Sequence, residues 1–350
     1  MKREHAACIL KPRGPFHVGE REGMREGSGV FIHSDTLFSA LCHSYLLLYG
    51  KAELERFLAA ENGTDPPLVL SSAFPYWKGK YYFPVPRNFT PTDKEAKKLR
   101  FIEQSAFETL LVEPLPDGKL IPYGLPAGVI ETDDVPKVTV SRTGGSATDE
   151  GGFYHVGLTF YKDASLYFLA RYGTDDSRKK VEAAMRLMCD EGIGGYRTVG
   201  KGQFEQPDFG QKVSIPEPES PDAGLMLSLY YPKETESQGL PDGFYDLVPR
   251  RGYVFSPTTR SLRRKEVSMF SEGAVFPGSC RTGKLVDVTP HGFNDHFVYR
   301  CGLAFTIPCK LIPSRHSEPP SSCHSARSYG GAATRSEESS TPSLSGGPHA

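Results

Sequence analysis

The chain has 350 residues, enough for about two domains and a sizeable buried core. Its 41 Lys and Arg residues balance 42 Asp and Glu residues, and the formal net charge of −1 excludes a polybasic protein whose whole surface attracts nucleic acid. The 36 glycines and 29 prolines favour turns and β structure over a helical bundle.

The N-terminal part of the chain alternates predicted strands and helices. Apolar periodicity and turn residues predict, in chain order, a strand at 6–10, helices at 34–49 and 51–60, strands at 68–73 and 81–84, a strand at 165–171, a helix at 177–190 and a strand near 202–206. Ser34 is expected to cap the first helix, with Asp35 at the positive end of its dipole, and Ser177 to cap the helix at 177–190. The order βαββαβ predicts a ferredoxin-like module over residues 1–208.

A long insertion, residues 85–160, separates the second and third strands of that module. A strand at 98–102 and a short helix at 106–112 are expected in it. Farther on, the segments 138–142 and 153–156 flank a polar, glycine-containing turn, which predicts a β-hairpin with a long tip.

The rest of the chain divides by composition. A Pro- and Glu-rich linker is expected at 209–223, and a second, mostly β domain at 224–312. Its strand candidates are 225–231, 253–256, 267–270, 285–288 and 297–307. Residues 313–350 are Ser-rich and poor in large apolar side chains, so they predict a disordered tail.

The seven cysteines and the hydropathy pattern indicate the compartment. No two cysteines have the spacing of a zinc site, and Cys42 and Cys189 fall in apolar helical patterns typical of buried thiols. The N-terminus has no signal-peptide pattern, and no apolar stretch approaches the length of a membrane span. These features predict a cytoplasmic protein without metal, cofactor or membrane association.

The segment 192–204 is the most informative one for chemistry, because it carries five glycines and two cations, Arg197 and Lys201, and no acid. Glycines allow a close backbone approach and can direct N–H groups at an anion. The run 195–201 also matches the core of a nucleotide-binding P-loop. However, Gly202 replaces the Ser or Thr that binds Mg²⁺, and the run follows a predicted helix instead of a strand, which disfavours a nucleotide enzyme. A glycine-rich turn without a ligand remains an alternative.

A second basic concentration spans residues 250–265, with six cations, no acid and the aromatics Tyr253 and Phe255. Arginines interleaved with aromatics suit an RNA backbone and stacked bases. A solvated loop or a subunit interface explains the same pattern.

A catalytic set is harder to find. His17 and His33 are candidates for the general base of a metal-independent endoribonuclease. Asp35 is already explained as a helix-start residue, and no complete hydrolase or deaminase motif is present. Catalysis therefore stays the alternative to a binding function.

Three segments together carry a family resemblance: FHVG at 16–19, FIHSDTLFSAL at 31–41 and GGYRTVGKGQF at 194–204. They resemble the RAMP-superfamily CRISPR-associated proteins, and HSDTLFSA is similar to the form in the fourth Csm subunit of type III-A effector complexes. The resemblance implies an α+β fold of two ferredoxin-like, RRM-like modules, with a hairpin thumb over 137–157. It also implies a non-catalytic subunit that clamps the repeat-derived 5′ handle of the CRISPR RNA, next to the large polymerase-like subunit and a backbone RAMP subunit.

With this resemblance, the predicted RNA-binding residues are His17, Gly19, Ser34, Lys137, Arg142, Gly194, Gly195, Arg197, Gly200, Lys201, Gly202, Arg250 and Arg251. The glycines are expected to present backbone N–H groups, and the cations to bind phosphates. Ser34 marks a helix start that suits a phosphate, and His17 is expected to stack on or bond to a base. Arg250 and Arg251 have an alternative role at the large subunit.

Overall fold

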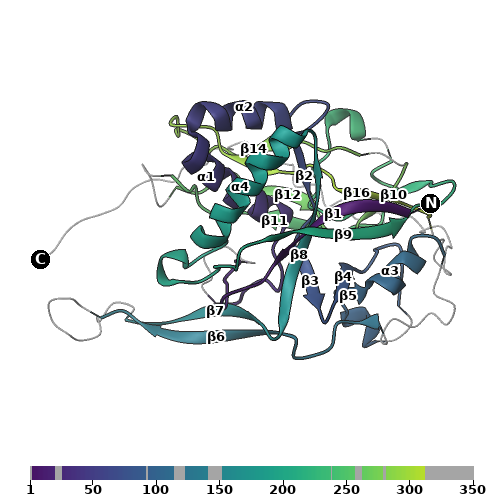
Figure 1. Cartoon of the computed structure of the whole chain (residues 1–350), viewed down its shortest axis with the longest axis horizontal. Coiled ribbons are helices and arrows are strands. Elements are labelled where there is room, and N and C mark those ends of the chain that lie inside the picture. The colour runs from purple at the N-terminus through teal and green to yellow at the C-terminus, as the bar shows by residue number, and fades with distance from the viewer. Residues whose placement is uncertain are drawn as a thin grey trace, which may run out of the picture. The chain divides into compact units, whose positions relative to one another are not determined.

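The computed structural model describes residues 2–19, 26–91, 94–113, 123–140, 152–237, 239–256, 262–278 and 281–311. Its centre is an antiparallel seven-stranded sheet with the order β5-β4-β3-β8-β1-β9, in which β2 also pairs with β8 (Figure 1). The strands are β1 (Lys2–Leu10), β2 (Leu68–Leu70), β3 (Phe74–Trp77), β4 (Lys80–Pro84), β5 (Phe101–Glu103), β8 (Ala164–Tyr172) and β9 (Asp208–Pro216). The strands predicted at 6–10 and 165–171 are confirmed.

Side-chain alternation explains why this sheet is buried on both faces. In β1, Cys8 packs into one apolar cluster with Phe168 of β8, whereas Ala7 packs into a second cluster with Leu169. Cys8 pairs with Phe168 and Ala7 with Leu169 in the antiparallel register, so each cluster takes every second residue.

Helices α1 (Ser34–Tyr49), α2 (Lys51–Glu61) and α4 (Asp175–Glu191) supply the first of these clusters, while α3 (Gln104–Leu110) packs into the second. The predicted helices are confirmed, but both predicted caps are wrong. His33 precedes α1, so Ser34 is already helical, and Thr174 caps α4 by accepting the N–H of Ser177. The cap of α4 lies three residues earlier because Thr174 and Ser177 bond reciprocally.

The last strand of the sheet corrects both the strand predicted near 202–206 and the linker predicted from residue 209. Strand β9 (Asp208–Pro216) pairs with β1 along most of its length. Val213 and Ile215 point into the core, and Lys212, which directly precedes Val213, forms an ion pair with Glu4 at 2.8 Å. The prolines and acidic residues that follow β9 are typical of a linker, so the alternation of buried and exposed residues in β9 is not recognised from the sequence.

A hairpin is present in this region, with β6 (Ile130–Val138) paired with β7 (Phe153–Tyr161), and it projects from the sheet at the lower left of Figure 1. The strand predicted at 138–142 is misplaced, because β6 ends at Val138, whereas the strand predicted at 153–156 lies in β7. The paired strands reach farther toward the core than the sequence indicates. Residues 141–151, which include the predicted tip and Arg142, lie outside the described residues.

The C-terminal half forms three small antiparallel sheets: β13 (Val275–Pro277), β10 (Ala223–Met226) and β16 (Thr306–Cys309); β11 (Leu247–Arg250) and β12 (Val267–Phe270); β14 (Leu285–Asp287) and β15 (Tyr299–Cys301). In the described part of this half the only helical residues are the 3₁₀ turn Glu234–Glu236. This half therefore departs from the predicted ferredoxin-like plan, which needs two helices. The strand predicted at 253–256 is an isolated bridge between Tyr253 and Arg263.

The two halves share one core. Leu225 and Phe305 from the C-terminal half pack into the same cluster as Phe74 and Phe107 of the N-terminal half. Residues Met1–Ser314 accordingly form a single compact unit, and a division into two domains remains a prediction. In the described ranges, no helix is both long and apolar enough to span a membrane. The predicted tail, 313–350, lies outside them.

Candidate nucleic-acid interface

The glycine-rich segment 192–204 connects α4 to β9 and contains the 3₁₀ turn Arg197–Val199. It therefore runs from a helix to a strand, the reverse of a P-loop. Gly194 has φ +92°, and a Cβ there would lie 2.2 Å from the carbonyl oxygen of His17. A Cβ on Gly202, which has φ +72°, would lie 2.1 Å from the carbonyl oxygen of Ile193. These glycines let the segment pack against the chain near residue 17.

The backbone N–H groups of this segment mostly stay within the protein, which corrects the predicted anion cradle. Gly195 donates to the carbonyl of His17 at 2.8 Å, Gly200 to Arg197 at 3.0 Å, and Gly202 to Pro15 at 3.1 Å. An N–H that already has a backbone acceptor gains little from a phosphate. The glycines therefore determine the shape of the loop, and the groups of the loop that suit an anion are the side chains of Arg197 and Lys201.

His17 connects this loop to the hairpin. Its Nδ1 lies 2.8 Å from the carbonyl oxygen of Gly157 in β7, so Nδ1 carries the proton and donates it. Its ring meets Tyr196 edge-on, with centroids 5.3 Å apart, and its own carbonyl accepts the Gly195 N–H. Gly19 lies close to the remaining ring nitrogen, Nε2, because a Cβ there would sit 3.8 Å from it. His17 thus connects the loop to the middle of β7.

Arg197 and Lys201 are the cations that this loop presents. Among the residues that the structure describes, neither forms an ion pair. The Arg197 guanidinium lies over the ring of Phe255, 4.8 Å from its centroid, and Phe255 is 64% exposed. His43 of α1 meets the same ring edge-on, and burial together with the Arg197 charge lowers the pKa of His43.

Arg197 and Phe255 belong to two basic segments that are separate in the sequence, and the structure brings them into contact. The one available signal was the aromatic content of 250–265. An exposed aromatic ring with a guanidinium over it offers a surface on which a nucleobase can stack.

Arg250, in contrast, is a core residue and not an RNA contact. Its Nε and Nη2 donate to the two carboxylate oxygens of Asp35 at 2.9 and 2.8 Å, and Arg300 donates to the same carboxylate at 2.5 Å. All three residues are buried. Burial raises the pKa of Asp35, but Arg250 and Arg300 outweigh it and hold that pKa well below its usual range. The ion cluster joins the start of α1 to the C-terminal half.

The prediction that Ser34 contacts RNA is also wrong, because Ser34 is buried and hydrogen-bonded within the protein. Its side-chain oxygen accepts the backbone N–H of Leu229 at 3.0 Å, and its own N–H donates to Ser72 at 2.8 Å. Only 1% of Ser34 is exposed, so the start of α1 offers no seat for a phosphate.

The remaining predicted contacts are Arg251 and Lys137. Arg251 is partly exposed and pairs with Glu266 at 2.7 Å, and its carbonyl oxygen accepts from Arg300. Lys137 lies exposed near the outer end of β6. Both cations remain accessible to an anionic ligand.

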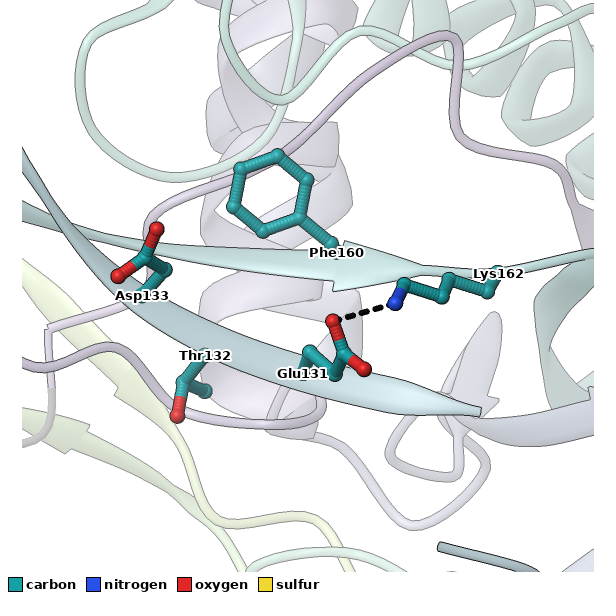
Figure 2. A pocket seen from close by; sticks show the side chains of 5 residues that line it. All are labelled: Glu131, Thr132, Asp133, Phe160 and Lys162. Atoms are coloured by element: carbon teal, nitrogen blue, oxygen red, sulfur yellow. Dashed lines mark ion pairs between the residues drawn. The ribbon is translucent and has the colours of Figure 1, made fainter. Parts of the chain in front are cut away.

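An open hollow of about 430 Å³ lies along the hairpin, lined by Glu131, Thr132, Asp133, Phe160 and Lys162 (Figure 2). Lys162 is bound to Glu131 at 2.6 Å, and Asp133 adds a second carboxylate. The acids make this face unsuited to phosphate, so any RNA contact of the hairpin falls toward its outer end.

Comparisons with known proteins establish the family of this chain. Residues 10–205 match the RAMP superfamily. The chain belongs to the RAMP superfamily. Its residues 219–309 match the CRISPR Csm4 C-terminal domain, so both halves bear out the resemblance predicted from the sequence.

Curated relatives carry the name CRISPR system Cms protein Csm4. The protein from Methanocaldococcus jannaschii is 23% identical over 82% of this RAMP chain and 89% of its own length. The one from Thermococcus onnurineus is 26% identical, with 87% and 96% covered. The one from Mycobacterium tuberculosis is 28% identical, with 81% and 92% covered.

Solved structures with the same fold include a Csm1-Csm4 cassette in complex with pppApA, with a TM-score of 0.58 at 21% identity, covering 89% of this chain and 100% of that one. A Csm3-Csm4 subcomplex of the type III-A interference complex gives a TM-score of 0.58 at 20% identity, with 88% and 99% covered. In this RAMP chain, segments 16–19 and 194–204 meet through His17 and Gly195.

Proposed function

We propose that the chain is a non-catalytic RNA-binding subunit of a type III-A CRISPR interference complex, acting in the cytoplasm and clamping the repeat-derived 5′ handle of the CRISPR RNA. One observation carries the proposal. The loop that presents Arg197 and Lys201, without ion-pair partners among the described residues, is connected through His17 to the middle of β7 in a projecting hairpin.

This geometry suits a short single strand. Phosphates lie at Arg197 and Lys201, a base stacks on the exposed ring of Phe255, and the strand continues toward Lys137 on the hairpin. Single-stranded RNA is recognised in this way, by cations at the backbone and flat side chains at splayed bases. The near-neutral net charge of the chain agrees with binding of only a short segment of RNA, because few cations are then needed.

The proposal also includes contacts of this chain with two other subunits of the complex. Solved relatives are Csm1-Csm4 and Csm3-Csm4 complexes, which supports contacts of this chain with a large polymerase-like subunit and with a backbone RAMP subunit. The strand order β3-β8-β1-β9 supports a ferredoxin-like N-terminal module, and β6 and β7 supply its thumb.

The test uses the complete complex with its co-purified guide RNA. The double variant Arg197→Ala/Lys201→Ala is expected to leave the 5′ handle open to added nuclease, while Lys179→Ala, an exposed lysine of α4, keeps it protected. Equal protection in all three complexes would remove the proposal.

His33 keeps a second candidate function open, an endoribonuclease that processes precursor CRISPR RNA. Its Nδ1 lies 2.7 Å from the carboxylate of Glu272, which leaves Nε2 as the base for a 2′-hydroxyl. In the described ranges no cluster of acids, histidines and cysteines is arranged to hold a metal, so the test is cleavage in EDTA. Cleavage of repeat RNA that His33→Asn abolishes would establish this function in place of the first.

A further inference from the structure

A cleft of about 420 Å³ opens between segments far apart in the sequence. Its walls come from residues 18–19 and 29–33 before α1, from residues 84–87 and 97–101 around β4 and β5, here called the 84–101 wall, and from residues 248–250 and 271–272 of the β11–β12 region. This volume lies within the range of small-molecule sites. Apart from Gly19, His33 and Arg250, its lining takes no part in the functions considered above.

Backbone bonds hold these walls in place. The N–H of Arg87 donates to the carbonyl of Gly273 at 2.9 Å, and the N–H of Val85 donates to the carbonyl of Arg100 at 3.2 Å. Gly273 has φ +84°, and a Cβ there would lie 2.6 Å from the carbonyl oxygen of Val85. The close approach of the two halves requires glycine at this position.

The wall from 84–101 is strongly basic, and its cations are Arg87, Lys97, Lys98 and Arg100. Arg87 pairs with Asp246 at 3.1 Å and Lys98 with Glu95 at 2.8 Å, in both cases between exposed side chains. Exposed pairs of this kind contribute little, so a phosphate can replace the carboxylate. Lys97 is exposed and forms no ion pair with any residue that the structure describes.

The lining also contains one carboxylate, that of Glu272, which is buried and accepts from His33 at 2.7 Å and from Ser72. Arg250 in the lining is paired with Asp35. The four cations of the 84–101 wall outnumber the single carboxylate in the lining, so the cleft favours an anionic ligand.

A flat apolar surface completes the cleft. Phe31 lines it, and its ring is held edge-on by Phe101 at 5.4 Å and by His33 at 4.6 Å. An aromatic ring beside a group of cations is the combination that binds a nucleobase with its phosphate.

We propose that this cleft binds one phosphorylated nucleotide, with its base against Phe31 and its phosphate among Arg87, Lys97 and Arg100. Val18 and Gly19 line the cleft and directly follow His17, whose carbonyl accepts the N–H of Gly195 in the 192–204 loop, so the cleft and this loop adjoin the same short segment. The inference rests on the proposed function in that the nucleotide is one unstacked residue of the bound RNA. A free mononucleotide has the same chemistry and is the other source.

The experiment compares the full-length chain with Arg87→Ala/Lys97→Ala, Arg197→Ala/Lys201→Ala and the control Lys179→Ala. The probes are a fluorescent single-stranded RNA copied from the 5′ end of the co-purified guide, and AMP and UMP by calorimetry. Arg87→Ala/Lys97→Ala is expected to bind the RNA about tenfold more weakly and to flatten the logarithmic salt slope by about 1.4, for two lost phosphate contacts. Photocrosslinking of 4-thiouridine RNA is expected to label Phe31 or His33.

The outcomes separate the two proposals. Weaker RNA binding with crosslinks in the cleft confirms the RNA as the source of the nucleotide. Binding of AMP or UMP that only Arg87→Ala/Lys97→Ala abolishes, with RNA binding unchanged, assigns the cleft to a free nucleotide. If that variant matches Lys179→Ala for every probe while Arg197→Ala/Lys201→Ala loses RNA, the cleft inference is overturned and the RNA-binding function stands. If the wild-type chain binds no RNA, the proposed function fails.

Discussion

The guanidinium of Arg250 forms two hydrogen bonds with the carboxylate of Asp35, a residue 215 positions earlier in the chain. Arg300 binds the same carboxylate, so a single buried anion holds two cations and ties the start of α1 to β11 and β15. Burial, together with the charges of Arg300 and Arg250, lowers the pKa of nearby Arg264 to about 10, so a third arginine lies close to this cluster.

This crowding predicts that the anion matters more than either cation. Asp35→Asn leaves buried arginines without a counter-charge and is expected to cost about 3–5 kcal/mol of unfolding free energy. Arg250→Met removes a cation and leaves Asp35 paired with Arg300, so its cost is expected to be smaller. Urea unfolding of both variants checks the order, with the exposed Arg251→Ala as control. A larger loss for Arg250→Met would contradict this account of the cluster.

The glycines of the 192–204 loop give the second prediction. Gly200 has φ +76° with open space around its Cα, so Gly200→Ala is expected to cost only about 1–2 kcal/mol, the strain of a left-handed alanine. Gly202→Ala adds a clash with the carbonyl of Ile193 and is expected to move the loop and lose RNA binding. Fluorescence anisotropy with the guide RNA measures both variants. Equal binding by both would show that the packing of the loop does not position Arg197 and Lys201.

Local patterns explain which parts of the fold could be predicted. Helices α1 and α4 and strands β1 and β8 could be predicted because the apolar period and turn residues act over a few neighbouring residues, although both predicted caps are wrong. Strand β9 could not be recognised as part of the main sheet, because its pairing with β1 joins opposite ends of the N-terminal half. The sequence of β1 or of β9 alone does not determine the register in which the two strands pair.

The candidate site shows the same division. The sequence identified His17, Arg197 and Lys201 by residue type and glycine context. It assigned Arg250 to RNA because a cation in a basic run looks the same whether it is exposed or buried against Asp35. Contact between Arg197 and Phe255 depends on how the two halves pack, and no local pattern encodes it.

The exposed ring of Phe255 supports a third prediction. Phe255→Ala is expected to weaken RNA binding by about 1–3 kcal/mol, the contribution of one stacked base, and to leave the salt slope unchanged because no charge is lost. Phe255→Trp is expected to retain binding. Phe297, which is 69% exposed, provides the matched control Phe297→Ala. A changed salt slope in Phe255→Ala would mean that the ring acts by holding Arg197 in place.

The buried carboxyl group of Glu61, at the end of α2, gives a prediction for pH. Burial raises the pKa of Glu61 to about 9, and the backbone of Leu68 offsets this only in part. The folded chain therefore keeps a proton that the unfolded chain, with a pKa near 4.5, releases. Between these two values the native state binds more protons, so this group makes the unfolding free energy fall as pH rises, by up to about 1.4 kcal/mol per pH unit.

Glu61→Gln removes this titration and keeps the shape of the protonated side chain. The variant is expected to match the wild type near pH 5 and to become progressively more stable than it toward pH 8.5. Urea unfolding at a series of pH values measures the difference, and Glu55→Gln, an exposed change on the same helix, is expected to track the wild type throughout. Parallel profiles for Glu61→Gln and the wild type would show that Glu61 is ionised in the folded chain.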